Sequence, residues 1–138
     1  MDKGFWMLLA ALAMLSTTVM AQQAKPVDFG KREFENNCAA CHGRDGKGGG
    51  VYVEYLKRSP PDLTTMTARN AGVFPLSKVY EVIEGAGAGH GGRDMPIWGQ
   101  DYRVKAAEYY IDMPYDSEAY VRVRILALSE YVSRLQSK

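Results

Sequence analysis

The stretch Cys38-Ala39-Ala40-Cys41-His42 decides how the rest of the chain is interpreted, because it holds both cysteines of the 138-residue sequence. Two cysteines at this spacing are compatible with a disulfide, a redox pair or part of a metal site. A disulfide closing so short a loop constrains the unfolded chain very little, which disfavours a purely structural bridge. A thioredoxin-like pair would follow a strand, whereas the residues before Cys38 have a helical pattern. A zinc site would need His42 and His90 as well, and adjacent ligands at positions 41 and 42 are geometrically awkward.

The same five residues suit the covalent attachment of a haem. Two thiols one helical turn apart can add across the two vinyl groups of the porphyrin, and the next residue, a histidine, then reaches the iron from the same side. Cys38 and Cys41 would be the covalent tethers and His42 an axial ligand of the iron. The motif therefore predicts one covalently attached haem c, with its iron, as the cofactor.

The N-terminal segment has the pattern of an export signal. Lys3 gives a basic start, the chain then runs apolar from Phe5 to Val19, broken only by residues 16–18, and Ala21 offers a small residue at a cleavage site. This arrangement is typical of a secretory signal peptide. An uncleaved membrane anchor is the alternative, but the apolar run of about 15 residues is shorter than the roughly 20 that span a bilayer. We expect residues 1–21 to be a signal peptide and residues 22–138 to be one domain in the periplasm.

The composition gives no reason to expect nucleic acid as a partner, since the formal net charge is +1. After the signal no other stretch approaches transmembrane length. Apolar spacing predicts helices and no strand of any length, and therefore an all-α fold. The expected elements are a helix from about Phe29 to the cysteines with Asp28 as N-cap, a helical turn at 52–56, a helix from Leu76 or Ser77 to Glu84 ended by Gly85, a short helix at 103–110, and a long helix from Asp116 or Ser117 to about Gln136.

With these features the chain resembles exported bacterial class I cytochromes c, the small monohaem family, from Gly30 to about Leu135. In that family a glycine and an aromatic residue lie eight and four residues before the first cysteine and cross an aromatic residue of the C-terminal helix. Gly30, Phe34 and Tyr131 stand at the matching positions. The resemblance implies the cytochrome c fold, in which the N- and C-terminal helices cross and shorter helices and loops wrap one covalent haem.

The resemblance also implies a methionine as second axial ligand, on a loop between the middle and last helices. Met95, followed by Pro96, fits that place. His90, in a glycine-rich loop, and Met113, in a second Met-Pro dipeptide, are alternatives, and Met66 is a weaker one because it closely follows the proline segment.

Other haem contacts follow from the family pattern. The carbonyl of Pro61 would accept the Nδ1 proton of His42, and Leu63 would pack on the ring. A helix stop and a buried leucine are the plainer interpretation of these two residues. Trp98 would shield the haem edge or donate to a propionate, or else belong to the core. Candidate propionate partners are Arg58, Arg69 and Arg93.

The segment from about Gln100 to Tyr115 departs from compact members of the family, which are shorter here. It contains four tyrosines at positions 102, 109, 110 and 115. It is interpreted either as a surface excursion that packs its own tyrosines or as a docking surface beside the haem.

The predicted function is outer-sphere transfer of single electrons between redox proteins, because an iron with both axial positions filled has no site for substrate. We therefore expect an electron-transfer protein with no catalytic residues of its own, and partners such as a dehydrogenase, reductase or oxidase. Such a protein is expected to be a monomer or a subunit of a complex. The alternatives are the haem subunit of a periplasmic dehydrogenase or reductase complex and a gas sensor with a labile sixth ligand.

Overall fold

The computed structural model describes residues 26–85, 95–111 and 116–137. Within these ranges the chain is helical and forms no strand, which confirms the predicted all-α fold. The elements are α2 (Phe29–Asn37), α3 (Ala39–His42), the 3-10 turns η1 (Val53–Tyr55) and η2 (Leu63–Thr65), α4 (Met66–Arg69), α5 (Leu76–Glu84), α6 (Trp98–Tyr109) and α7 (Ser117–Arg134). The predicted signal peptide lies outside the described residues.

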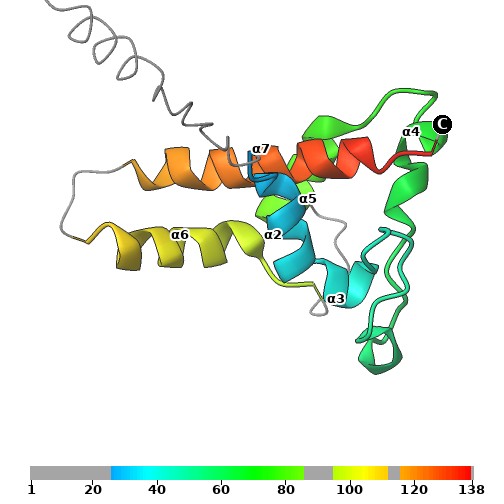
Figure 1. The fold of residues 1–138 in the computed structure, drawn as a ribbon, viewed down its shortest axis with the longest axis horizontal. Helices are drawn as coiled ribbons and strands as arrows, with labels where there is room; N and C mark the ends of the chain where they lie inside the picture. The colour runs from blue at the N-terminus through cyan, green and yellow to red at the C-terminus, as the bar shows by residue number, and fades with distance from the viewer. Residues whose placement is uncertain (1–25, 86–94, 112–115, 138) are drawn as a thin grey trace, which may run out of the picture.

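Helix α2 begins where the sequence predicts and crosses α7, as Figure 1 shows. The carboxylate of Asp28 accepts the backbone N–H of Lys31 at 2.9 Å, which satisfies one of the free donors at the helix start. At the crossing, Gly30 lies against the backbone of Ala127 with no room for a side chain. One turn later the ring of Phe34 packs on that of Tyr131, with centroids 5.2 Å apart. The predicted crossing of the first and last helices is confirmed.

Helix α7 forms one wall of the core. Asp116 caps its start, accepting the backbone N–H groups of Glu118 and Ala119 at 3.0 Å. The apolar stripe predicted for this helix faces inward, because residues spaced by three or four positions share one side of a helix. The buried core residues of the stripe are Val121, Ile125, Leu128 and Val132, with Leu135 partly buried beside them.

Helix α5 has the predicted bounds and ends at Gly85, whose φ of 96° lies in the left-handed region. Glycine adopts this conformation without strain, which explains why the helix stops there.

Helix α6 begins at Trp98, five residues before the predicted start, and packs along α7. One interpretation of the segment from about Gln100 to Tyr115 is a surface excursion that packs its own tyrosines. The structure differs at Tyr102, which is fully buried in the core. The excursion interpretation holds in part, since Tyr110 packs on Tyr109 within the segment and on Tyr120 of α7.

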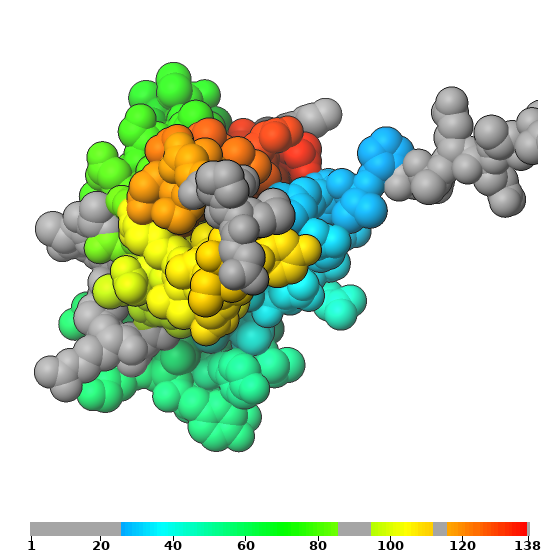
Figure 2. All heavy atoms as spheres, turned by 90° about the vertical axis from the view of Figure 1, so that its left-hand side faces the viewer, coloured from blue at the N-terminus to red at the C-terminus, as the bar shows by residue number. Residues whose placement is uncertain are grey.

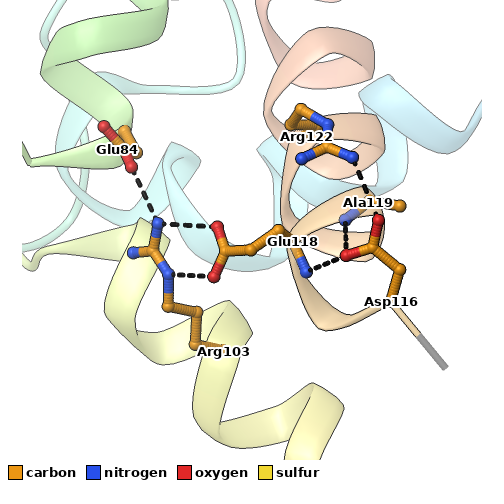
Figure 3. Close-up of polar contacts among 6 residues, drawn as sticks. All are labelled: Glu84, Arg103, Asp116, Glu118, Ala119 and Arg122. Atoms are coloured by element: carbon orange, nitrogen blue, oxygen red, sulfur yellow. Dashed lines mark hydrogen bonds and ion pairs between the residues drawn. The ribbon is translucent and has the colours of Figure 1, made fainter. Parts of the chain in front are cut away.

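Arg103 of α6 joins this helix to its two neighbours. Its guanidinium donates to both carboxylate oxygens of Glu118 on α7, at 2.8 and 3.0 Å, and to Glu84 on α5 at 2.8 Å. Figure 3 shows the guanidinium between the two carboxylates. Seen end-on, α6 and the first turns of α7 lie against one another (Figure 2). Helix α6 is therefore anchored on α5 and α7.

Hydrogen bonds hold the segment between α3 and α5 to α3 on one side and to Gln136, just after α7, on the other. Gly48 donates its backbone N–H to the carbonyl of His42 at 2.7 Å, and Leu63 donates to Gly46 at 2.8 Å. Gly48 has a φ of 88° and lies against the carbonyl of Pro60, so a side chain fits there neither in conformation nor in space. At the other side, Gln136 donates to the carbonyl of Leu63 at 2.7 Å.

Candidate cofactor site

An apolar cavity lies between α2, α3, α5 and α7. It encloses about 520 Å³ of space not filled by protein atoms, part of it open to solvent. Twelve residues form its walls: Phe34, Cys38, His42, Leu63, Met66, Lys78, Val79, Val82, Ile83, Met95, Leu128 and Val132. Cys38, His42 and Met95, predicted from sequence as site residues, thus face one space.

Cys38 and His42 reach the cavity because a second short helix starts directly where α2 ends. The N–H of Cys38 still donates to the carbonyl of Phe34 at 2.9 Å, and the N–H of His42 donates to the carbonyl of Cys38 at 2.8 Å. One helical turn therefore separates the two residues, which places both on one side of α3. His42 is buried. Cys41 is half-buried and is not among the wall residues.

The environment of Cys38 speaks against a redox thiol pair. Burial raises the pKa of the Cys38 thiol to about 12, and the negative charges of Glu33 and Cys41 add to this effect. A reactive cysteine needs a lowered pKa, because the thiolate is the nucleophile. A free thiol at this position would be protonated at neutral pH and poorly suited to disulfide exchange.

The zinc interpretation finds no support among the described residues. Across 26–85, 95–111 and 116–137, no group of three or more His, Cys, Asp or Glu side chains is placed to hold a metal ion. His90, the fourth ligand that zinc would need, lies outside the described residues. The donors at the cavity wall are instead one thiol, one imidazole and two thioethers.

Two methionines approach the cavity. Met95 precedes α6 and is half-buried, and Met66 starts α4 and packs against the core. Met66, a weaker ligand candidate by its position in the sequence, lines the same cavity as Met95. The other two candidate ligands, His90 and Met113, lie outside the described residues.

Of the other predicted contacts, Leu63 lines the cavity, whereas Pro61 is exposed and Trp98 is half-buried against the core. The roles given to Pro61 and Trp98 stay predictions. Arg69 donates to the carbonyl of Asp62 at 2.9 Å, Arg58 is exposed, and Arg93 lies outside the described residues.

Lys78 is a wall residue that the sequence analysis missed. Its side chain is 57% exposed, so an apolar stem lies along the wall while the ammonium group stays near solvent. The signal was present in the sequence, because Lys78 precedes Val79 and Val82 on the apolar face of α5. A lysine at the edge of an apolar stripe is ordinarily expected to point into solvent and not to line a cavity.

The helical fold and the attachment motif at the wall of an apolar cavity define a class, the small helical haem proteins. The family model of cytochrome c matches residues 27–112, more than half of the chain, and this protein belongs to the cytochrome c family. Comparisons with curated proteins and with solved structures found no match. Within the described residues, no helix is both long enough and apolar enough to cross a membrane.

Members of the family carry a covalently bound haem c, which is an iron porphyrin. This chain is accordingly a haem c electron-transfer protein. The residues present fit that group. The cavity wall is apolar almost throughout, which suits a porphyrin face, and the imidazole and thioether donors suit haem iron. The predicted cofactor is therefore confirmed at the level of the family.

Proposed function

We propose that this chain is a periplasmic carrier that passes single electrons between redox proteins, with His42 and Met95 as the axial ligands of its haem iron. The observation that carries the proposal is that Cys38, His42 and Met95 line one cavity whose other wall residues, apart from Lys78, are apolar. When bound, the haem supplies a one-electron Fe(III)/Fe(II) couple.

The residues of this chain hold and shield that group. Cys38 and Cys41 tether it, and His42 is fixed at the end of α3 by the backbone bonds that continue the helix. Leu63 on one side and Val79 and Leu128 on others exclude water from the ring. A water-poor, rigid shell keeps the reorganisation between the two oxidation states small.

A thioether ligand favours the ferrous state and gives a higher reduction potential than a second histidine would. Lys78 would neutralise a propionate at the solvent side of the cavity, since it lines the wall while its side chain is 57% exposed and its ammonium group lies 4.0 Å from Glu81. Pro61 would orient the His42 ring through its carbonyl, and Trp98 would shield the haem edge.

The decisive experiment compares ferric absorption spectra of the wild type, Met95→Ala and Met66→Ala. A thioether bound to ferric haem gives a weak far-red band, which we expect to disappear in Met95→Ala and to persist in Met66→Ala. Met66→Ala is a matched control because both methionines line the cavity. Loss of the band in Met66→Ala alone would overturn the ligand assignment, and its persistence in both would move the assignment to Met113.

Carbon monoxide tests the electron-carrier role itself. The reduced wild type is expected to bind carbon monoxide slowly at neutral pH, because the sixth position is occupied, and Met95→Ala is expected to bind it rapidly. Rapid binding by the wild type would instead favour a gas sensor.

The periplasmic location rests on the pattern of residues 1–21. Expression of the full chain in a bacterium with haem c maturation, followed by fractionation and N-terminal sequencing, tests it. We expect haem protein in the periplasmic fraction with Gln22 as its first residue. Retention in the membrane fraction with Met1 intact would indicate an anchor.

A haem subunit of a dehydrogenase or reductase complex is the second candidate, favoured by the apolar side chains that α6 and α7 leave at the surface. Tyr109, the last residue of α6, and Ile111, two residues beyond it, are 78% and 80% exposed. Aromatic side chains of this kind are enriched at interfaces. Size-exclusion chromatography of material from the native host distinguishes the two, since a carrier elutes as a monomer and a subunit elutes with its complex.

A further inference from the structure

A buried ion pair joins α2 to α7 beside the attachment motif. Arg124 donates to Glu33 Oε1 at 2.5 Å, and the Glu33 side chain is only 7% exposed. The second oxygen, Oε2, accepts the hydroxyl of Tyr102 at 3.0 Å and the side-chain amide of Asn37 at 3.1 Å. Three donors from three helices thus hold one carboxylate.

The guanidinium of Arg124 is enclosed by aromatic rings. Its central carbon lies 4.4 Å from the ring centroid of Tyr120, 5.0 Å from that of Phe29 and 5.6 Å from that of Tyr102. Such contacts stabilise a cation away from water. The Arg124 side chain is 21% exposed and the charge of Glu33 is deeper in the molecule.

Stability alone is a weak reason to keep such a pair. Removing two charges from water costs several kcal/mol, and well-packed apolar residues often serve a fold equally well. The exposed pair of Asp28 and Arg134, at 2.6 Å, already connects α2 and α7. The position of the buried pair therefore needs another explanation.

The orientation of the pair provides one. Glu33 lies on α2 and precedes Cys38, the residue directly after that helix, by five positions, which corresponds to about 7.5 Å along the helix axis. Arg124 belongs to α7. Phe34, the next residue after Glu33, lines the cavity. The charge of Glu33 is felt at the cavity wall, since it contributes, after burial, to the raised pKa of Cys38.

We propose that the Glu33–Arg124 pair, with its negative end toward the haem attachment, holds the iron at a lower reduction potential than its axial ligands alone would set. A carboxylate near the iron favours Fe(III), and a guanidinium favours Fe(II). Because Glu33 is five residues from Cys38 along the chain and its charge acts on that residue, we expect its effect to exceed that of Arg124. This inference rests on the proposed function in one respect, namely that the haem occupies the cavity beside Cys38.

The test is a double-mutant cycle that removes the two charges singly and together, with the haem reduction potential as the measured quantity. Glu33→Gln is expected to raise the equilibrium constant for reduction on the order of tenfold, as expected for a charge about 10 Å away at an effective dielectric constant near 20. Tenfold corresponds to 59 mV for one electron. Arg124→Gln is expected to lower the constant by a smaller factor, and the double variant to lie between the two single variants.

Controls separate charge from packing. Arg134→Gln breaks the exposed pair between the same helices and is expected to leave the potential unchanged. Tyr102→Phe keeps both charges while removing one hydrogen bond, so it is expected to lower the melting temperature with little change in potential. Arg124→Lys keeps the cation and is expected to restore the wild-type potential.

If the reduction potential shifts in the same direction in both single variants, the proposal is overturned. Loosened packing would change the potential in one direction in both variants, whereas loss of opposite charges changes it in opposite directions. No shift in Glu33→Gln would overturn it too. That variant leaves no unpaired buried carboxylate and remains testable if Arg124→Gln fails to fold. The far-red band of each variant shows whether the ligand set is intact. If the wild type lacks this band, the Met95 assignment fails while the opposite shifts are still expected.

Discussion

Gly30 and Ala127 touch through their backbones where α2 crosses α7. A Cβ atom built on Gly30 would overlap the carbonyl oxygen of Ala127 and lie 3.0 Å from Cβ of Tyr131. The carbonyl belongs to the backbone of a helix with a buried face, so it has little freedom to retreat. The absence of one methyl group at Gly30 therefore allows the close approach of the two terminal helices.

Gly30→Ala is expected to destabilise the protein by at least about 2 kcal/mol, because overpacking at a backbone contact outweighs the gain of about 1 kcal/mol in helix propensity. Urea unfolding followed by circular dichroism measures the change. Gly49→Ala is the matched control, since a Cβ there meets nothing within 4 Å. Equal stability of the two variants would contradict the close crossing.

Ile125→Ala is expected to cost about 2–5 kcal/mol, because Ile125 is fully buried and its truncation leaves a cavity. The haem spectrum should stay unchanged, since Ile125 does not line the cofactor cavity. Val123→Ala, at a 62% exposed position of the same helix, should change stability by less than about 0.5 kcal/mol. A loss at Val123 as large as that at Ile125 would show that the stripe does not face the core.

The bond between Arg103 and Glu118 should make part of the stability depend on pH. The hydrogen bond from Arg103 holds the pKa of Glu118 below its ordinary value of 4.5. The stabilisation is therefore complete above that value and is lost as the pH falls through the lower pKa of the folded state. We expect the melting temperature to fall below about pH 4.5, and Arg103→Gln to weaken this dependence.

Lys105→Gln controls for the loss of positive charge on α6. Lys105 pairs with Asp101 within the same helix, so its loss leaves the bond to Glu118 in place. An acid dependence that is as steep in Arg103→Gln as in Lys105→Gln would show that the bridge to Glu118 is not its source.

Lys78→Gln is expected to lower the equilibrium constant for haem reduction by less than about fivefold, because an exposed ion pair contributes at most about 1 kcal/mol. Removing a cation near a propionate leaves the negative charge of that group uncompensated, which favours Fe(III). Potentiometric titration at low and high salt measures the effect, which salt should weaken. Lys31→Gln, at an exposed position that does not line the cavity, should leave the potential unchanged.

The sequence predicted the features that depend on neighbours in the chain. The motif from Cys38 to His42 spans one helical turn, so its chemistry follows from spacing alone. Asp28, Gly85 and Asp116 mark helix ends because capping is a local interaction between a side chain or a turn and the nearest backbone groups. Gly30, Phe34 and Tyr131 were found through the family pattern, and the structure brings them together as expected.

The start of α6 was missed for a physical reason. Trp98 to Gln100 contains a glycine and begins two residues after Pro96, which locally weakens a helical pattern. Packing on α5 and α7 decides the outcome, because Tyr102 gains a fully buried place there.

By itself the sequence determined that this chain carries a haem, where most of its helices begin or end, and which face of the last helix is apolar. Only the tertiary structure decided that Met66 and Lys78 share a cavity with Met95, and that Glu33 meets Arg124 across 91 positions of sequence. The physical reason is that helix periodicity and capping are encoded within a few residues. The pairing of a buried charge or a cavity wall depends instead on how whole helices cross, which no short stretch of sequence specifies.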